Sequence, residues 1–279
     1  MAARPPPLSP DVASGRIVES SSLTAHFTRI VVEVPEVERL CLPRGADTAV
    51  GIYFGANQYA PGRTYTVRHD DRPARRIVVD VLMHGDGIGT AWADQVAGGD
   101  TVVLAHANSW YRPPATADWQ LLVADMSGLP ALARILDTPP TTATTAIVEL
   151  VDETDLAYLP DQPNVLVLPL FGTGNGVSDS ALAQHVVSHT RAGGTGYCWF
   201  AGEARDARAV RKHLRHEQRW VPEQLDVMGY WRRSSADWDS RFALVGADLY
   251  SVYTRALDEG KSAKIAMEEF DEALERVGL

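Results

Sequence analysis

The sequence predicts an N-terminal antiparallel β-barrel, then an α/β domain with a parallel sheet, and finally two C-terminal helices. Three observations support this order. Short alternating segments fill the first part of the chain, a strand–helix–strand rhythm follows a proline-containing break at residues 111–116, and two amphipathic stripes close the chain. We expect a disordered tail over residues 1–15, the barrel domain over 16–114, the α/β domain over 115–234 and a helical extension over 235–279.

Composition indicates a soluble, cytoplasmic enzyme. The 279 residues carry a net charge of −10, which argues against nucleic acid as a partner. No run approaches the roughly 18 apolar residues of a membrane helix, so we expect no membrane insertion. The segment Met1–Pro10 is proline-rich and lacks the apolar core of a signal peptide. Two cysteines, Cys41 and Cys198, suit a reducing compartment and offer no iron–sulfur ligand set.

The first domain is predicted to be a barrel because its β-branched and aromatic residues alternate in short segments bounded by turn residues. Asp70-Asp71-Arg72-Pro73 is a turn signal, so we expect the segments on either side of it to pair as a hairpin. The predicted strands are residues 28–34, 49–54, 63–69, 77–83 and 101–105.

The strand Arg63-Thr64-Tyr65-Thr66-Val67-Arg68 has the side chains of a cofactor site. A flat ring with a diphosphate needs an aromatic platform, short hydroxyl donors and a planar cation, which Tyr, Thr and Arg supply. Alternation places Arg63 and Tyr65 on one face and Thr66 and Arg68 on the other. An edge strand with a solvated arginine at each end is the alternative interpretation.

A glycine-rich segment follows one strand later. His84-Gly85-Asp86-Gly87-Ile88-Gly89-Thr90 opens onto the short helix predicted at residues 91–96. Glycines let backbone N–H groups approach an anion, Thr90 can cap the helix, and the helix N-terminus attracts negative charge. Together with the preceding strand, this segment predicts a cradle for the diphosphate of FAD.

The second domain alternates strands with helices, which predicts a parallel sheet covered on both faces. Its predicted strands are 120–124, 146–151, 165–170, 197–201 and 225–229, and its predicted helices are 129–136, 178–189 and 205–217. The Thr-rich run at residues 138–145 is interpreted as a loop. Beyond residue 235, Phe242, Val245, Leu249 and Val252 form one stripe and Met267, Phe270, Leu274 and Val277 form the other. Gly260 separates the two helices, Ser262 can cap the second, and we expect the stripes to pack within the chain.

Four ordered blocks resemble the siderophore-interacting proteins, which are FAD-dependent ferric-siderophore reductases related to the ferredoxin–NADP reductases. The blocks are R-T-Y-T-V-R with the following D-V-L-M-H-G-D-G, then residues 117–125 with 129–136, C-W-F-A-G-E-A at 198–204, and G-Y-W-R at 229–232. The resemblance implies that NADH or NADPH reduces a bound FAD, which then delivers electrons singly to Fe(III) in a ferric siderophore. It also implies that Tyr65 and Thr66 lie at the reacting end of the flavin.

The resemblance assigns further residues to the two cofactors. FAD would be held by Arg63, Tyr65, Thr66, Val67, Arg68, His84, Gly87, Gly89, Thr90, Ala91 and Trp92, and the nicotinamide cofactor would contact Asp125, Gly202 and Glu203. The last three follow strands at the edge where α/β sheets bind ligands. A helix-capping role for Asp125 and a first-turn charge at Glu203 are the alternatives.

A basic stripe gives the candidate substrate residues. Arg208, Lys212, Arg215 and Arg219 lie on one face of the predicted helix, and Arg232 follows Tyr230-Trp231. The stripe either holds an anionic ferric chelate or is a solvated helix face. We therefore assign Arg208, Lys212, Arg215 and Arg232 to the substrate, and no protein metal site is expected.

One segment departs from the family pattern. After residues 101–105 the family has Gly-Pro and a small residue, whereas this chain has His106-Ala107-Asn108-Ser109-Trp110-Tyr111-Arg112. The added bulk leaves room for two alternatives: a flavoprotein acting on an organic substrate, and a siderophore-binding module without electron transfer. C-terminal extensions like this one occur in the branch of the family without a strong NADPH preference, which favours NADH. The siderophore and the oligomeric state stay open.

Overall fold

The computed structural model describes residues 11–279 except 56, 58, 86, 190–192 and 234, so the predicted tail over 1–10 lies outside the described residues. The first domain is an antiparallel sheet with the order β4-β3-β7-β1-β2-β6-β5. Its strands are β1 (Ala13–Ser22), β2 (Phe27–Glu33), β3 (Ala49–Tyr53), β4 (Gly62–Thr66), β5 (His69–Asp71), β6 (Arg76–Leu82) and β7 (Thr101–Asn108). The first strand starts at Ala13, so residues 13–15 belong to the sheet and not to a tail.

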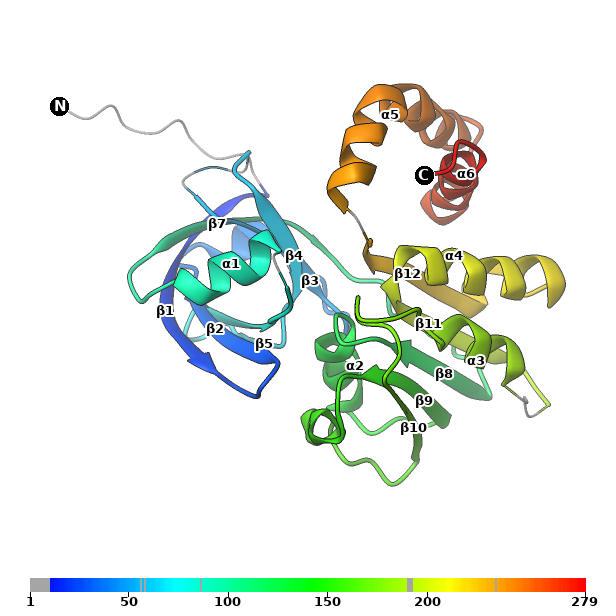
Figure 1. Cartoon of the computed structure of the whole chain (residues 1–279), viewed down its shortest axis with the longest axis horizontal. Helices are drawn as coiled ribbons and strands as arrows, with labels where there is room; N and C mark the ends of the chain where they lie inside the picture. The colour runs from blue at the N-terminus through cyan, green and yellow to red at the C-terminus, as the bar shows by residue number, and fades with distance from the viewer. Residues whose placement is uncertain (1–10, 56, 58, 86, 190–192, 234) are drawn as a thin grey trace.

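The sheet curls so that its two ends approach each other (Figure 1). Just after β4, the backbone N–H of Arg68 donates to the carbonyl oxygen of Val78 in β6 at 2.8 Å. The predicted hairpin is only partly correct, because β4 pairs with β3 and only the short strand β5 pairs with β6. Helix α1 (Ile88–Gln95) lies across the curled sheet and contacts β4 and β6.

The second domain is a five-stranded parallel sheet with the order β10-β9-β8-β11-β12. The strands are β8 (Trp119–Ala124), β9 (Ala143–Leu150), β10 (Val165–Phe171), β11 (Gly196–Glu203) and β12 (Leu225–Trp231). Residues 143–145 of the predicted loop therefore belong to β9. The strand order reverses between β8 and β11, and ligands bind beyond the carboxyl ends of strands at such a position.

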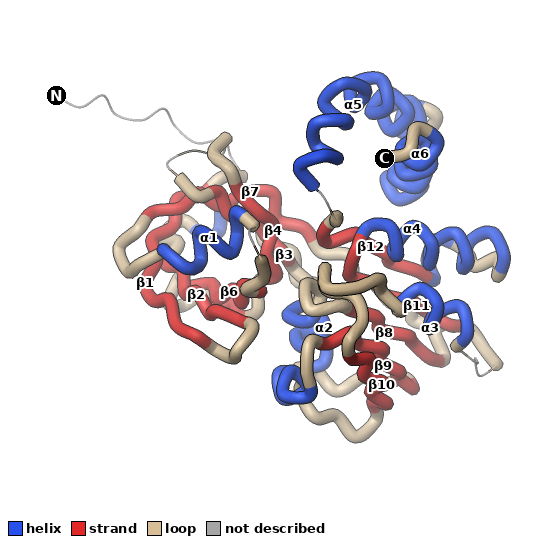
Figure 2. Tube along the Cα trace, in the orientation of Figure 1, coloured by secondary structure: helices blue, strands red, loops and turns tan. Residues whose placement is uncertain are grey.

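Helices cover both faces of this sheet (Figure 2). Helix α2 (Leu129–Leu136) packs with Leu122 and Val148 on one face, whereas α3 (Leu182–Ser188) and α4 (Ala204–Lys212) pack with Val123 and Ile147 on the other. Helix α4 continues as a π-helical turn over His213–Glu217. The fold is therefore the predicted barrel followed by a doubly covered α/β sheet.

Two helices close the chain, as predicted. They are α5 (Ser235–Asp258) and α6 (Ala263–Arg276), and the hydroxyl of Ser262 caps α6 by accepting from the Ile265 N–H at 3.3 Å. Phe242 and Phe270 from the two predicted stripes meet edge to face with ring centroids 6.4 Å apart. Met267 and Val277 remain 45% and 46% exposed, so the stripes are only partly covered. Among the described residues, no helix is long and apolar enough to cross a membrane.

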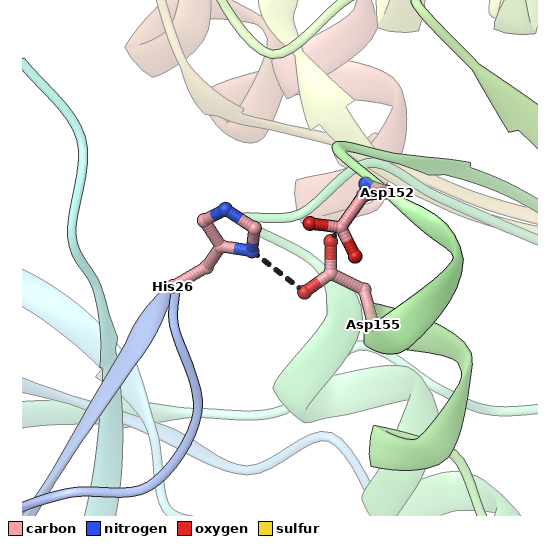
Figure 3. A group of neighbouring side chains, drawn as sticks. All are labelled: His26, Asp152 and Asp155. Atoms are coloured by element: carbon pink, nitrogen blue, oxygen red, sulfur yellow. Dashed lines mark hydrogen bonds and ion pairs between the residues drawn. The ribbon is translucent and has the colours of Figure 1, made fainter.

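A seam of polar contacts joins the two domains. Arg68 forms a two-pronged ion pair with Asp137 at the end of α2, and Arg134 donates to the carbonyl oxygen of Val67. Figure 3 shows a further contact, in which Nδ1 of His26 lies 2.8 Å from Asp155 and Asp152 lies beside them. These two aspartates also cap the 3₁₀ turn Glu153–Tyr158, because the side chain of each accepts a hydrogen bond from a backbone N–H group. The cluster therefore has a structural role at the domain boundary.

A buried carboxylate holds in place the segment of chain that connects the two domains. Asp47 is fully buried and accepts from the Ser109 hydroxyl at 2.6 Å, the Tyr111 N–H at 2.8 Å and the Trp199 indole at 3.1 Å. It also accepts from the N–H of Trp110 at 2.9 Å. The unusual segment after β7 is thus anchored to the barrel and to β11 at once.

Candidate functional site

Arg63, Tyr65 and Gly89 form a cradle between β4 and α1. A Cβ on Gly89 would lie 2.5 Å from the Tyr65 hydroxyl and 3.7 Å from the Cγ of Arg63, so only glycine allows this approach. The predicted alternation is confirmed, since Arg63 and Tyr65 share this side of the strand. The Tyr65 hydroxyl is buried and has no hydrogen-bond partner among the described residues. Burial raises the pKa of Tyr65, so it stays a neutral phenol.

The N-terminus of α1 is open beside this cradle. Gly87 occupies the N-cap position and gives no side-chain hydrogen bond to the first turn. The prediction that Thr90 caps the helix is wrong, because its hydroxyl donates to the carbonyl oxygen of His84 at 3.0 Å and accepts from the His84 N–H at 3.3 Å. Thr90 and His84 therefore close the loop on itself. Among the described residues, no side chain bonds the N–H groups of the first turn, so these remain available to an anion.

Aromatic rings line the far side of the helix start. Trp92 stacks on Phe54 with centroids 4.5 Å apart and planes 16° apart, and the Tyr65 ring lies 6.0 Å from Trp92. Ala91 donates its N–H to the Gly87 carbonyl oxygen, which fixes the first turn. The Arg63 guanidinium is exposed and, among the described residues, bonds only the neighbouring Gly62 carbonyl oxygen. A planar cofactor with a diphosphate fits the exposed guanidinium of Arg63, the N-terminus of α1 and the unpartnered hydroxyl of Tyr65.

The structure separates Arg68 from this cradle. Its guanidinium pairs with Asp137 in the domain seam, because the chain turns towards β5 after Thr66. Val67 is fully buried in the barrel core, so its side chain has a packing role. Thr66 is buried on the face opposite Tyr65 and lies beside Tyr230 of β12, whose buried hydroxyl has no hydrogen-bond partner among the described residues. Burial raises the pKa of Tyr230.

The second part of the site lies at the carboxyl ends of β8 and β11. Asp125 and Gly202 meet there, since a Cβ on Gly202 would lie 3.1 Å from Oδ2 of Asp125. That oxygen accepts from the Trp231 indole at 2.5 Å. Asp125 also accepts from the N–H and hydroxyl of Ser127, as the capping alternative expected, although Gly128 holds the N-cap position of α2. Burial raises the pKa of Asp125, against the effect of these hydrogen bonds.

Glu203 caps α4 by accepting from the Arg205 N–H at 2.5 Å, and its other oxygen accepts from the Arg233 N–H at 3.3 Å. Its carboxylate therefore serves the helix end, in agreement with the alternative interpretation.

Sequence reasoning missed the loop after β10. Gly172, Gly174, Asn175 and Gly176 all have positive φ values, between 53° and 80°. Asn175 accepts from the Met126 N–H at 2.9 Å, so this loop lies over the end of β8. A Cβ on Gly174 would lie 1.7 Å from a carboxylate oxygen of the buried Glu149. The run Gly-Thr-Gly-Asn-Gly after a predicted strand was the signal that could have identified it.

The basic stripe is covered in part by the C-terminal segment and is exposed in part, at Lys212 and Arg219. Arg208 donates to the Leu279 carbonyl oxygen at 2.6 Å, and Nε of Arg215 lies 3.3 Å from Glu268 of α6. Lys212 is exposed but borders the same junction. Arg232 lies with its Cζ 4.3 Å above the Trp238 ring of α5. The substrate role predicted for Arg215 is therefore corrected, because α6 covers it, whereas Arg208 also lines the cavity described next.

A cavity of about 620 Å³ lies between the sheet edge and the C-terminal helices. The α/β domain supplies the loop after β10 and the ends of β11 and β12, while α5 supplies Trp238 and Arg241. Arginines outnumber carboxylates in its lining, in a protein that is acidic overall: the five are Arg205, Arg208, Arg232, Arg233 and Arg241, and the three carboxylates are Asp179, Glu203 and Asp206. This is a suitable place for an anionic ligand with a flat ring.

Asp206 makes the stability of this region depend on pH. Burial, and then the nearby carboxylates Glu203 and Glu149, raise its pKa to about 6. The neutral form is favoured in the folded state, so the stabilisation is present below about pH 4 and is lost as the pH rises through about 6. We expect Asp206→Asn to stabilise the protein at pH 7.5 by on the order of 1 kcal/mol, since solvent screens part of the effect. Thermal unfolding at pH 4.5 and 7.5 checks this, and an equal stability difference at both values would contradict it.

Comparisons with known proteins agree with the two halves of the site. Residues 46–109 match the siderophore-interacting FAD-binding domain, and residues 117–234 match the siderophore-interacting protein model. An uncharacterized protein of Mycobacterium tuberculosis is 29% identical over 78% of this chain and 81% of its own length. The NADPH-dependent ferric-chelate reductase of Escherichia coli is 27% identical over 66% of this chain and 71% of its own length.

Solved structures agree on the fold. The siderophore-interacting protein of Acinetobacter baumannii aligns with a TM-score of 0.74 at 19% identity, covering 86% of this chain and 98% of its own. A ferredoxin NADP⁺ reductase of Neisseria gonorrhoeae, solved with FAD and NADP, aligns with a TM-score of 0.58 at 15% identity over 79% of this chain and 99% of its own. The fold is thus ferredoxin reductase-like, and the two family models confirm the family resemblance stated for the sequence.

Proposed function

Because the chain belongs to the siderophore-interacting protein family, we propose that it is an FAD-dependent reductase that passes electrons from a nicotinamide dinucleotide to a ferric siderophore. One observation carries the proposal. The orphan hydroxyl of Tyr65, the free guanidinium of Arg63 and the uncapped N-terminus of α1 converge on one cradle in the domain matched as FAD-binding.

Each residue of the cradle has a role that follows from its chemistry. Arg63 would grip the diphosphate together with the first-turn N–H groups of α1. Tyr65 would present its ring to the flat part of the cofactor and donate its buried hydroxyl. Thr66, whose side chain lies on the opposite face, would act at the reacting end through its backbone at the end of β4. When bound, FAD supplies the change from two-electron to one-electron chemistry that ferric iron requires.

The donor is proposed to bind at the carboxyl ends of β8 and β11. Asp125, Gly202 and Glu203 border this edge, and the arginine-lined cavity next to it suits the phosphates of a dinucleotide. We propose NADH as the favoured donor, since the chain carries a C-terminal extension of the kind found in relatives without a strong NADPH preference. The E. coli relative is named for NADPH, so both donors belong in the test.

The proposed electron acceptor is Fe(III) held by a siderophore, a chelator separate from the protein, and the proposed place of the reaction is the cytoplasm. Siderophore oxygens are hard ligands that suit Fe(III) better than Fe(II), so a single electron loosens the complex and releases Fe(II). Positive side chains at the cavity rim, among them Arg205 and Arg233, would favour an anionic chelate.

A second candidate has one observation in its favour. The ring centroids of Trp110 and Tyr230 lie 6.2 Å apart. Trp110 belongs to the segment that replaces the compact Gly-Pro turn of the family. This added bulk narrows the space beside Thr66 and favours a flavoprotein with a smaller organic substrate.

Reduction of the bound flavin by the donor tests the proposal. The purified protein should be yellow, release FAD and not FMN, and lose its flavin absorbance under anaerobic conditions when NADH is added. NADPH serves as the matched comparison at equal concentration. A protein that remains colourless after incubation with FAD would exclude the proposed function, and an FAD-loaded protein that neither donor bleaches would leave only a binding module.

A further inference from the structure

The helices α5 and α6 form a hairpin that lies outside both matched ranges, 46–109 and 117–234. Its interior is aromatic: Trp238 stacks on Phe242 with centroids 4.7 Å apart, and Phe270 meets Tyr250 at 6.1 Å. Among the described residues, none of the four apolar core clusters of the molecule includes a residue of α5 or α6. The hairpin therefore lies outside the apolar core clusters of both domains, and its two helices contact each other. Figure 1 shows the pair of helices set beside α4 and β12.

Ion pairs hold the hairpin on the α/β domain. Arg211 of α4 pairs with Asp271 of α6, and Arg215 lies 3.3 Å from Glu268. At the other end of α6, Lys264 lies 2.8 Å from Asp226 of β12. These side chains are 12–34% exposed, so the pairs are half-buried, and their strength depends on ionic strength more than an apolar contact would.

The seated hairpin forms one wall of the arginine-lined cavity. Trp238 and Arg241 of α5 line it together with Trp231, Arg232 and Glu203 of the α/β domain, and the Arg232 guanidinium lies over the Trp238 ring. The indole N–H of Trp238 is buried and has no hydrogen-bond partner among the described residues. A buried donor without an acceptor among the described residues, on the wall of a cavity lined by five arginines and three carboxylates, is a position that an acceptor atom of a ligand would complete.

We propose that the α5–α6 hairpin completes the donor site, with Trp238 and Arg241 contacting the dinucleotide and the ionic seam on α4 holding them in place. A ligand that touches both walls binds only when the hairpin is seated, so donor binding and hairpin docking strengthen each other. This inference rests on the proposed function, because it takes the dinucleotide as the occupant of the cavity.

The experiment uses the full-length, FAD-loaded protein with NAD⁺ as the probe. Hydrogen exchange of α5 and α6 should be slow at about 20 mM salt, faster at about 500 mM, and slow again when NAD⁺ is added at high salt. Titration calorimetry at constant salt then gives the NAD⁺ affinity. The double variant Arg211→Glu/Arg215→Glu should weaken NAD⁺ binding by at least about fivefold and expose the hairpin to exchange.

Two matched variants separate the possible causes. Adding Glu268→Arg/Asp271→Arg to the double variant reverses the seam and should restore most of the NAD⁺ affinity. Trp238→Phe keeps the ring stack but removes the indole N–H, and should weaken NAD⁺ binding while hairpin exchange is unchanged.

The outcomes distinguish this inference from the proposed function. Wild type and all variants binding NAD⁺ equally would overturn the hairpin's role and leave the donor site intact. Exchange of the hairpin that ignores salt, or no recovery in the reversed seam, would overturn the ionic docking. A flavin-loaded wild type that binds no dinucleotide would overturn both.

Discussion

Replacing Arg63 with alanine should weaken FAD binding by about 1.5–3 kcal/mol, or about 10- to 150-fold, the usual contribution of a hydrogen bond to a charged group. The guanidinium is exposed beside the α1 N-terminus, and its only bond among the described residues is to a neighbouring carbonyl oxygen. Its removal should therefore change the free energy of unfolding little, while it removes the positive charge from the proposed diphosphate site. Fluorescence titration of apoprotein with FAD measures the effect.

Arg68→Ala is the matched control. This arginine forms an ion pair with Asp137 in the domain seam. Its removal should therefore lower the midpoint of thermal unfolding and change FAD affinity by less than about threefold. An equal loss of FAD affinity in the two variants would return Arg68 to the diphosphate site, and an unchanged affinity in Arg63→Ala would remove Arg63 from it.

Replacing Asp47 with alanine should destabilise the protein by about 3–5 kcal/mol. The carboxylate is fully buried and receives bonds from two side chains, Ser109 and Trp199, and from the backbone of residues 110 and 111. Without it, these donors remain buried and unpaired at the crossing between the domains. The free energy of unfolding in urea measures the loss.

Asp47→Asn should cost less than the alanine variant, because the amide keeps one acceptor oxygen for these donors. Asp161→Ala, at an exposed site, should change stability by no more than about 0.5 kcal/mol. A loss at Asp47 no larger than at Asp161 would contradict the structural role of this carboxylate.

Local patterns predicted most of the fold. The helix at 129–136 has the bounds of α2, because a run of apolar residues with one proline near its start leaves little choice. The hairpin between residues 63–69 and 76–83 was only partly right, since strand composition shows that a segment is extended but does not choose its partner. The first strand was missed because its sequence, ASGRIVESSS, is too polar to stand out.

The site divides in the same way. The cradle of Arg63, Tyr65 and Gly89 follows from alternation and from one glycine, which are properties of adjacent residues. The contacts of Arg68, Arg215 and Arg208 depend on Asp137, Glu268 and Leu279, which lie 69, 53 and 71 residues away in sequence and meet them only after folding. A charged stripe predicts an interaction but does not say whether a ligand or the chain itself provides the opposite charge.

Reoxidation of the reduced protein by a ferric siderophore tests the central claim most directly. FAD-loaded protein is reduced with one equivalent of NADH under anaerobic conditions and mixed with a ferric siderophore in the presence of an Fe(II)-specific chelator. The account predicts that flavin absorbance returns and that two Fe(II) appear for each flavin reoxidised, because one hydride carries two electrons and each Fe(III) accepts one. Flavin that stays reduced in the presence of the ferric siderophore, yet reoxidises readily with another acceptor, would contradict it.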